Sequence, residues 1–160
     1  MTHKIVTLRK RKKDGHDSPY VTTDIPFGRS LTEIKDMLRR YGCEKILTFE
    51  EVVGSIPAHS LAFDFKGTKF LIEFPITYLA NPNGSGKALN MNVSGRIIYY
   101  KVKALLIDVE LNHLDFNQAM VPFMLLPTAS GRPTTVTDIL TIRDVNERAR
   151  EVQFMLGAGK

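Results

Sequence analysis

The chain has 160 residues, of which 43% are hydrophobic and 24% charged, a composition typical of one soluble globular domain spanning residues 1–160. No apolar run approaches the roughly 20 residues that cross a bilayer, so we expect no membrane-spanning helix. The N-terminus lacks the apolar stretch of a secretory signal, and the single cysteine, Cys43, cannot form an internal disulfide. Both features predict a cytoplasmic protein.

Positive charge is concentrated at the N-terminus. The chain carries 22 Lys and Arg residues against 17 Asp and Glu residues, a net charge of +5. Six of the bases lie in the first thirteen positions with no acid among them: Lys4, Arg9, Lys10, Arg11, Lys12 and Lys13. Such an arm attracts nucleic-acid phosphates, an anionic membrane surface or an acidic protein alike.

The first elements predict a hairpin. Ile5 to Leu8 and Tyr20 to Phe27 are β-branched or aromatic runs, and the polar stretch Arg9 to Ser18 separates them. Pro19 and a glycine in the polar stretch favour a long loop. The sequence therefore predicts a basic N-terminal hairpin over residues 1–27.

A helix is predicted over Ser30 to Tyr41. Ser30 and Glu33 have the spacing of a capping box, and apolar residues recur behind them at helical intervals. Gly42 suits the left-handed conformation that follows a helix end.

The next segment has the clearest strand pattern. Ile46 to Val53, Ser60 to Phe65 and Lys69 to Ile76 are separated by short turn sequences, which predicts a meander of three antiparallel strands. In the last two strands apolar side chains alternate, so at least one face of the sheet must be covered.

Two later stretches have helical periodicity, Gly95 to Leu114 and Thr135 to Leu156, and Thr135 with Asp138 forms a second candidate capping box. Asp115 to Arg132 fits either a helix or an extended run. We expect an α+β domain, with an antiparallel sheet of about five strands and about three helices packed on one face.

A long loop is predicted over Thr77 to Ser94, and within it Gly84, Ser85, Gly86 and Lys87 resemble the end of a phosphate-binding loop. Asn81 occupies the place of the first glycine and Ala88 the place of the magnesium-binding Ser or Thr, so nucleotide hydrolysis is not expected. A nuclease alternative depends on Asp64 and Lys66, with Glu50 or Glu51 as a second acid for a metal ion. Lys66 is explained more simply as part of a turn with Gly67.

A second basic region combines cations with tyrosines between Lys66 and Lys103, where Glu73 is the only acid. Single-stranded nucleic acid binds surfaces on which cations follow the backbone and bases stack on aromatic rings. Core packing is the competing explanation for at least one of the adjacent Tyr99 and Tyr100. The candidate binding residues are Arg9, Lys10, Arg11, Lys12, Lys13, Lys69, Tyr78, Lys87, Arg96, Tyr99, Tyr100, Lys101 and Lys103.

Three segments carry a family resemblance. The run from Arg29 to Ile34 that ends in Tyr41 and Gly42, then KFLIEFP at Lys69 to Pro75 and KVKALLI at Lys101 to Ile107, resembles a family of small phage and mobile-element proteins without a firm biochemical assignment. The predicted layout is similar to the archaeal single-stranded-DNA-binding proteins known as ThermoDBP. This resemblance implies a sheet with helices on one face and a basic, partly apolar cleft on the other.

We therefore expect a non-enzymatic protein that binds single-stranded nucleic acid, with DNA as the first candidate, with little sequence preference and without a cofactor or metal. The sequence does not decide between DNA and RNA or fix the oligomeric state. The alternatives are a protein-interaction or structural module, which self-associates through an exposed sheet edge or binds an acidic partner, and a metal-dependent nuclease. The sequence leaves open whether the two basic stretches share one surface.

Overall fold

The computed structural model describes residues 3–9, 20–80, 86–128 and 133–141. Within these residues the chain forms an α+β fold with four α-helices, a short 3-10 helix and eight strands in three sheets. The helices are α1 (Phe27–Arg40), α2 (Met91–Glu110), α3 (Phe116–Met120) and α4 (Val136–Thr141), and Val121–Phe123 is the 3-10 helix. None of the described helices has the length and hydropathy needed to cross a bilayer.

The predicted meander is confirmed. The strands β2 (Glu44–Val53), β3 (Ile56–Phe65) and β4 (Thr68–Glu73) pair antiparallel in the order β2-β3-β4. Lys66 and Gly67 join β3 to β4 with φ angles of 49° and 83°. Positive φ at both central residues defines a tight turn whose twist matches the flanking strands. This confirms the prediction that Lys66 forms a turn with Gly67.

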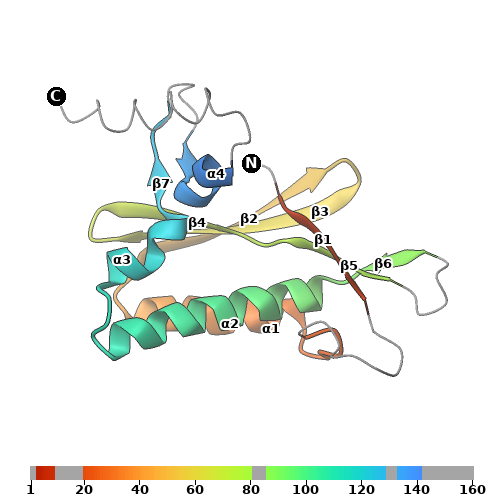
Figure 1. Ribbon diagram of the computed structural model, residues 1–160, viewed down its shortest axis with the longest axis horizontal. Coiled ribbons are helices and arrows are strands. Elements are labelled where there is room, and N and C mark those ends of the chain that lie inside the picture. The colour runs from red at the N-terminus through yellow and green to blue at the C-terminus, as the bar shows by residue number, and fades with distance from the viewer. Residues whose placement is uncertain (1–2, 10–19, 81–85, 129–132, 142–160) are drawn as a thin grey trace.

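The helices α1 and α2 lie side by side and cover one face of this sheet (Figure 1). The core between them is formed by Ile34, Leu38, Leu61, Phe63, Phe70, Ile72, Phe74, Ile98, Val102 and Leu106. Gly42 has φ of 85° just after α1, as predicted. The helix begins at Phe27 rather than at Ser30, because Ser30 is completely buried within it and cannot serve as a cap.

The predicted N-terminal hairpin is not formed. The strand β1 (Ile5–Arg9) is present, but the strand predicted over Tyr20 to Phe27 is absent, because residues 20–26 are turns and coil and Phe27 is the first residue of α1. Instead β1 pairs in parallel with β5 (Ile76–Ala80), which pairs antiparallel with β6 (Lys87–Leu89). The basic loop that the sequence predicts between the two hairpin strands, Arg9 to Ser18, lies outside the described residues from residue 10 on.

The strands are thus divided between sheets, which differs from the single sheet of about five strands predicted above. Pro75 separates β4 from β5, since proline cannot donate a ladder hydrogen bond. A two-stranded sheet of β7 (Leu125–Leu126) and β8 (Thr134–Thr135) follows α3.

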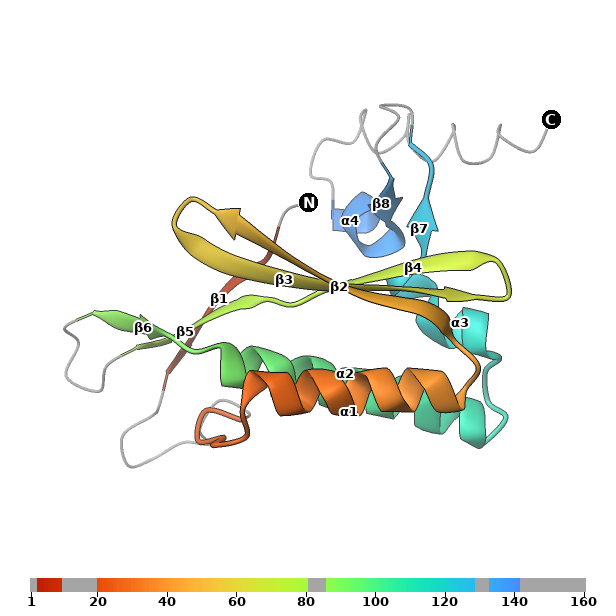
Figure 2. The ribbon, with the colours of Figure 1, turned by 180° about the vertical axis from the view of Figure 1, so that it is seen from behind.

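The helices also occupy two faces rather than one. Figures 1 and 2 show α4 and β7 on the side of the meander sheet opposite to α1 and α2. At the start of α4 the predicted capping box is confirmed: Asp138 N–H donates to Thr135 Oγ1 at 3.1 Å, and Thr135 N–H donates to Asp138 Oδ2 at 3.3 Å. The remainder of the predicted helix, beyond residue 141, lies outside the described residues. Asn90 caps α2, which begins four residues before the predicted Gly95.

Candidate nucleic-acid interface

The sheet β1-β5-β6 brings two distant parts of the chain into one register. Arg9 lies opposite Ala80, and Ala80 lies opposite Lys87, so these residues form one row across the three strands. A second row, two residues away along each strand, consists of Thr7, Tyr78 and Leu89. Because directly opposed residues share a face of a sheet and alternate residues return to it, both rows belong to the same face.

Ile76, opposite Ile5, is completely buried, but the remainder of this face is open to solvent to a greater or lesser extent. We call this open part the outer face: Ile5, Thr7, Tyr78, Lys87 and Leu89. The Nζ atom of Lys87 lies 4.3 Å from the centroid of the Tyr78 ring, a cation–π contact between adjacent strands. Tyr78 is half-buried, whereas Ile5 and Leu89 are 57% and 40% exposed. The outer face therefore combines a ring, a cation and uncovered apolar groups.

The same sheet is joined to the start of α2. Thr77 of β5 is completely buried, and its carbonyl accepts a hydrogen bond of 2.8 Å from the N–H of Asn90. Asn90 in turn caps α2, since its Oδ1 accepts a hydrogen bond from Val93 N–H. The sheet that carries the outer face is thus anchored to the helix.

The N-terminal basic segment starts at this sheet. Lys10, Arg11, Lys12 and Lys13 lie outside the described residues, and Arg9 is placed here by its backbone alone. The chain leaves the sheet at Arg9, beside the Lys87 row, and is described again from Tyr20, whose ring stacks on Tyr100 at 4.7 Å with an interplanar angle of 8°. In Figures 1 and 2 the strand β1 and the segment that leads into α1 both reach the end of the molecule that carries β6 and the start of α2.

Arg96 does not belong to this face. It is 5% exposed, and its Nη1 lies 2.6 Å from Glu33 Oε2 on α1. Its guanidinium also lies 3.9 Å from the Tyr99 ring centroid. We correct the prediction for Arg96 on this ground, because a buried and paired guanidinium is not available to a phosphate. Tyr99 is half-buried against the core, and the Tyr100 ring stacks on Tyr20, although Tyr100 stays 41% exposed.

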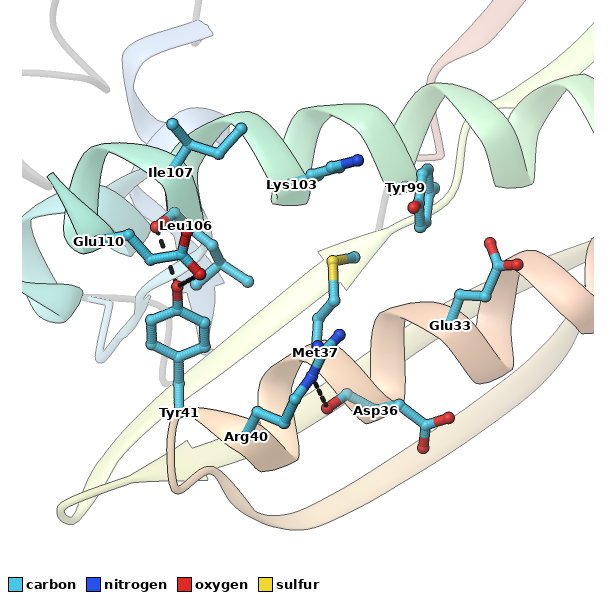
Figure 3. Close-up of a pocket in the computed structure, with 10 residues that line it drawn as sticks. All are labelled: Glu33, Asp36, Met37, Arg40, Tyr41, Tyr99, Lys103, Leu106, Ile107 and Glu110. Carbon is cyan, nitrogen blue, oxygen red and sulfur yellow. Dashed lines mark hydrogen bonds between the residues drawn. The ribbon is translucent and has the colours of Figure 1, made fainter.

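Three lysines predicted to bind nucleic acid are distributed over other surfaces. Lys101 Nζ lies 4.7 Å from the ring centroid of Phe123, where desolvation and the charge of Lys4 lower its pKa. Lys103 projects into the space between α1 and α2 (Figure 3). Lys69 lies 3.9 Å from Asp64 on the meander sheet. Of the described candidates, Arg9, Tyr78 and Lys87 share the outer face. A second group lies on α2, where Arg96 and Lys103 contact the rings of Tyr99 and Tyr100.

A groove of about 700 Å³ runs between α1 and α2 (Figure 3). Its lining residues are Glu33, Asp36, Met37, Arg40, Tyr41, Tyr99, Lys103, Leu106, Ile107 and Glu110. Three of these are acidic and two basic, so the groove does not favour an anionic ligand. Tyr41 donates a hydrogen bond of 2.7 Å to Glu110 near its end, and burial together with this carboxylate raises the pKa of Tyr41 to about 12.

The acids of the nuclease alternative are not brought together. Glu50 and Glu51 lie opposite His59 and Ala58, at the other end of β3 from Asp64, which corresponds to a separation of about 17 to 20 Å. Asp64 is instead paired with Lys45 at 3.5 Å. The described residues contain no group of three or more His, Cys, Asp or Glu that could hold a metal ion.

Cys43 is also not placed for chemistry. It is buried beside the core, and burial raises the pKa of its thiol to about 12. A thiol with this pKa is protonated at neutral pH and is not a nucleophile.

The sequence singled out Tyr78 and Lys87 but missed Ile5 and Leu89. Leu89 belongs to β6, a strand of three residues that is too short to give a periodic signal, so the sequence predicts a loop there. Ile5 was recognised as part of a strand, but only the pairing of β1 with β5 shows which neighbours it has.

Comparison of the chain with family models, curated proteins and solved structures gives no significant match. The resemblances to the phage and mobile-element family and to ThermoDBP therefore stay predictions. The functional conclusions below depend on the geometry of this chain.

Proposed function

We propose that this protein binds single-stranded nucleic acid, DNA in preference to RNA, on the outer face of the β1-β5-β6 sheet. The observation that carries the proposal is the register that places Tyr78 beside Lys87 and Lys87 in one row with Arg9. A base stacks on the exposed part of the Tyr78 ring, and the adjoining phosphates are neutralised by Lys87 and by the basic segment that begins at Arg9. Stacking on one aromatic side chain contributes roughly 1 to 3 kcal/mol and tolerates every base.

The surface suits a single strand better than a duplex. Duplex readers commonly place a basic helix in the major groove. The longest described helix, α2, buries Arg96 and directs Lys101 and Lys103 to different surroundings, Phe123 and the α1–α2 groove. A short open sheet with one ring and flanking cations resembles instead the stacking platforms that bind unpaired bases. The proposed activity is binding alone and uses no cofactor or metal.

Fluorescence anisotropy with labelled oligonucleotides tests the proposal. The wild-type protein is expected to bind a single-stranded DNA at low salt in preference to a duplex of the same sequence and to an RNA strand. Tyr78→Ala is expected to weaken binding about tenfold, whereas Tyr78→Phe keeps the ring and the affinity. Lys103→Ala is the matched control, because Lys103 is exposed but faces the α1–α2 groove. Absence of binding at low salt, or full affinity of Tyr78→Ala, would refute the proposal.

A further inference from the structure

The strand β2 is an open edge of the meander sheet. Among the described residues it pairs with β3 alone, and nearly all of its residues are exposed. Leu47, Phe49 and Val52 are 56%, 47% and 69% exposed, although each is a large apolar side chain. A long strand edge with uncovered apolar groups is a template for pairing with another strand.

The register with β3 shows which backbone groups of β2 are free. Val52 lies opposite Pro57, and a proline has no N–H, so this pair cannot exchange the two hydrogen bonds of a bonded pair. Bonded and non-bonded pairs alternate along an antiparallel ladder, and Glu50 and Thr48 are therefore non-bonded toward β3 as well. The N–H and C=O groups of Thr48, Glu50 and Val52 point to the open edge.

We propose that β2 pairs antiparallel with β2 of a second copy of this chain, with Thr48 opposite Thr48 of the other copy. In this register Leu47 of each copy lies opposite Phe49 of the other, so four exposed apolar side chains cover one another. The two Thr48 residues exchange backbone hydrogen bonds. Apolar pairs across strands stabilise a sheet.

The neighbouring symmetric registers are less complementary. Centring the pair on Glu50 places two carboxylates directly opposite each other, which is destabilising. Centring it on Phe49 places Leu47 opposite Glu51, so Leu47 and Phe49 of the two copies no longer cover one another. The Thr48 register pairs these two exposed groups, although it sets the half-buried Ile46 opposite Glu50. The bulge between Glu44 and Leu47 ends the regular part of the strand, and this limits the paired segment to the residues around Thr48. Two β2 edges are thus most complementary when Thr48 of one copy lies opposite Thr48 of the other.

The dimer proposed here does not depend on nucleic-acid binding. The β2 edge belongs to the meander sheet, whereas the outer face belongs to the β1-β5-β6 sheet. A variant that stays monomeric is expected to keep the affinity of one binding site for a short oligonucleotide. Failure of either proposal can therefore be distinguished from failure of the other.

Sedimentation velocity over a range of protein concentrations measures the association. The wild-type chain is expected to form a dimer, and Phe49→Lys to raise the dissociation constant at least about tenfold, since the change occurs twice in a symmetric pair. Leu111→Lys is the matched control: it makes the same change at a residue that is 58% exposed at the end of α2, away from β2. Circular dichroism checks that both variants fold.

Single cysteines identify the register. In a Cys43→Ala background, Thr48→Cys, Phe49→Cys and Glu50→Cys are oxidised separately, because each cysteine can bond only to its own copy across the axis. The proposal expects a disulfide-linked dimer for Thr48→Cys, whose two Cα atoms would lie about 5.5 Å apart, within disulfide range. A monomer at all concentrations, a dimer unaffected by Phe49→Lys, or preferential linkage at Phe49→Cys or Glu50→Cys would overturn it.

Discussion

The Nη1 atom of Arg96 lies 2.6 Å from the Oε2 atom of Glu33, and this ion pair joins α2 to α1. The Arg96 side chain is 6% exposed, whereas that of Glu33 is 32% exposed, so the cation is the buried partner. Ser30 Oγ lies 3.5 Å from the same nitrogen. The pair positions the two helices that support both larger sheets, which gives Arg96 a structural function in place of the predicted contact with a phosphate.

Replacing Glu33 by Gln is expected to destabilise the fold. The change leaves the buried Arg96 cation without its carboxylate, and loss of a charged hydrogen bond of this kind costs on the order of 2 kcal/mol. The measurement is the free energy of unfolding by chemical denaturation at pH 7. Asp36→Asn on the same helix is the control, because its ion pair with Arg39 is exposed on both sides. Equal stability of wild type and Glu33→Gln would contradict the structural role of the pair.

The same ion pair predicts a pH dependence. The hydrogen bond from Arg96 lowers the pKa of Glu33 below its ordinary value of 4.5. A group whose pKa is lower in the folded state stabilises the fold above the unfolded pKa, and this contribution is lost as the pH falls through the folded one. The free energy of unfolding should therefore fall on acidification below about pH 4.5. In Glu33→Gln this part of the decrease is expected to be absent, and a decrease as steep as in the wild type would contradict the assignment.

Because α1 and α2 are in close contact, we expect substitution by alanine to destabilise the fold at Gly95 but not at Gly28. A Cβ atom at Gly95 would lie 3.0 Å from Ser30 Cβ and 3.1 Å from Phe27 Cδ2. Gly95→Ala is expected to destabilise the fold by about 1 to 2 kcal/mol, because overpacking outweighs the gain in helix propensity. Gly28→Ala is the control, since no atom lies within 4 Å of the added methyl group. Thermal unfolding of the two variants provides the comparison, and a stabilised Gly95→Ala would show that the helices are not in contact there.

Glu73 predicts a stabilising substitution. It lies at the end of β4, and its Oε1 is buried without a hydrogen-bond partner among the described residues. Burial raises its pKa, as do Asp138 and Glu51, whereas His3 lowers it. A raised pKa in the folded state means that stability is lost as the pH rises from the unfolded toward the folded pKa. Removing the charge should therefore stabilise the fold at pH 7.

Glu73→Gln tests this expectation by denaturant unfolding at pH 7 and again below pH 4. The gain at pH 7 is expected to be on the order of 1 kcal/mol and to vanish in acid, where the wild-type carboxyl is already neutral. Glu44→Gln, an exposed acid on β2, is the control and should change little. A gain that is the same at both pH values would show that charge is not its cause.

Elements specified by neighbouring residues were predictable from the sequence. The turn at Lys66 and Gly67, the helix end at Gly42 and the capping box of Thr135 and Asp138 are all confirmed. In each case the signal is complete within four residues, because backbone geometry or one side-chain hydrogen bond determines the conformation. The α+β class follows from these local patterns.

The parts of the structure that the sequence did not predict depend on tertiary contacts. Ser30 and Glu33 have capping-box spacing, but Ser30 packs against Gly95 and Glu33 pairs with Arg96, so both side chains serve the contact between the helices. The pairing of β1 with β5 joins residues far apart in the sequence, and no local pattern specifies it. The candidate site was therefore predictable as a set of residue types, while the subset that shares a face required the register.

Lys87→Ala predicts a specific change in the salt dependence of binding. Each phosphate contact on a single strand contributes about 0.7 to the slope of log affinity against log salt concentration, because neutralising a phosphate releases counterions. We expect Lys87→Ala to reduce the slope by about this amount and Tyr78→Ala to lower affinity with the slope unchanged, since stacking releases no counterion. Anisotropy titrations at four salt concentrations measure both, with Lys103→Ala as control. An unchanged slope for Lys87→Ala would show that Lys87 does not contact a phosphate. The basic segment that begins at Arg9 would then be the remaining source of phosphate contacts in the proposal.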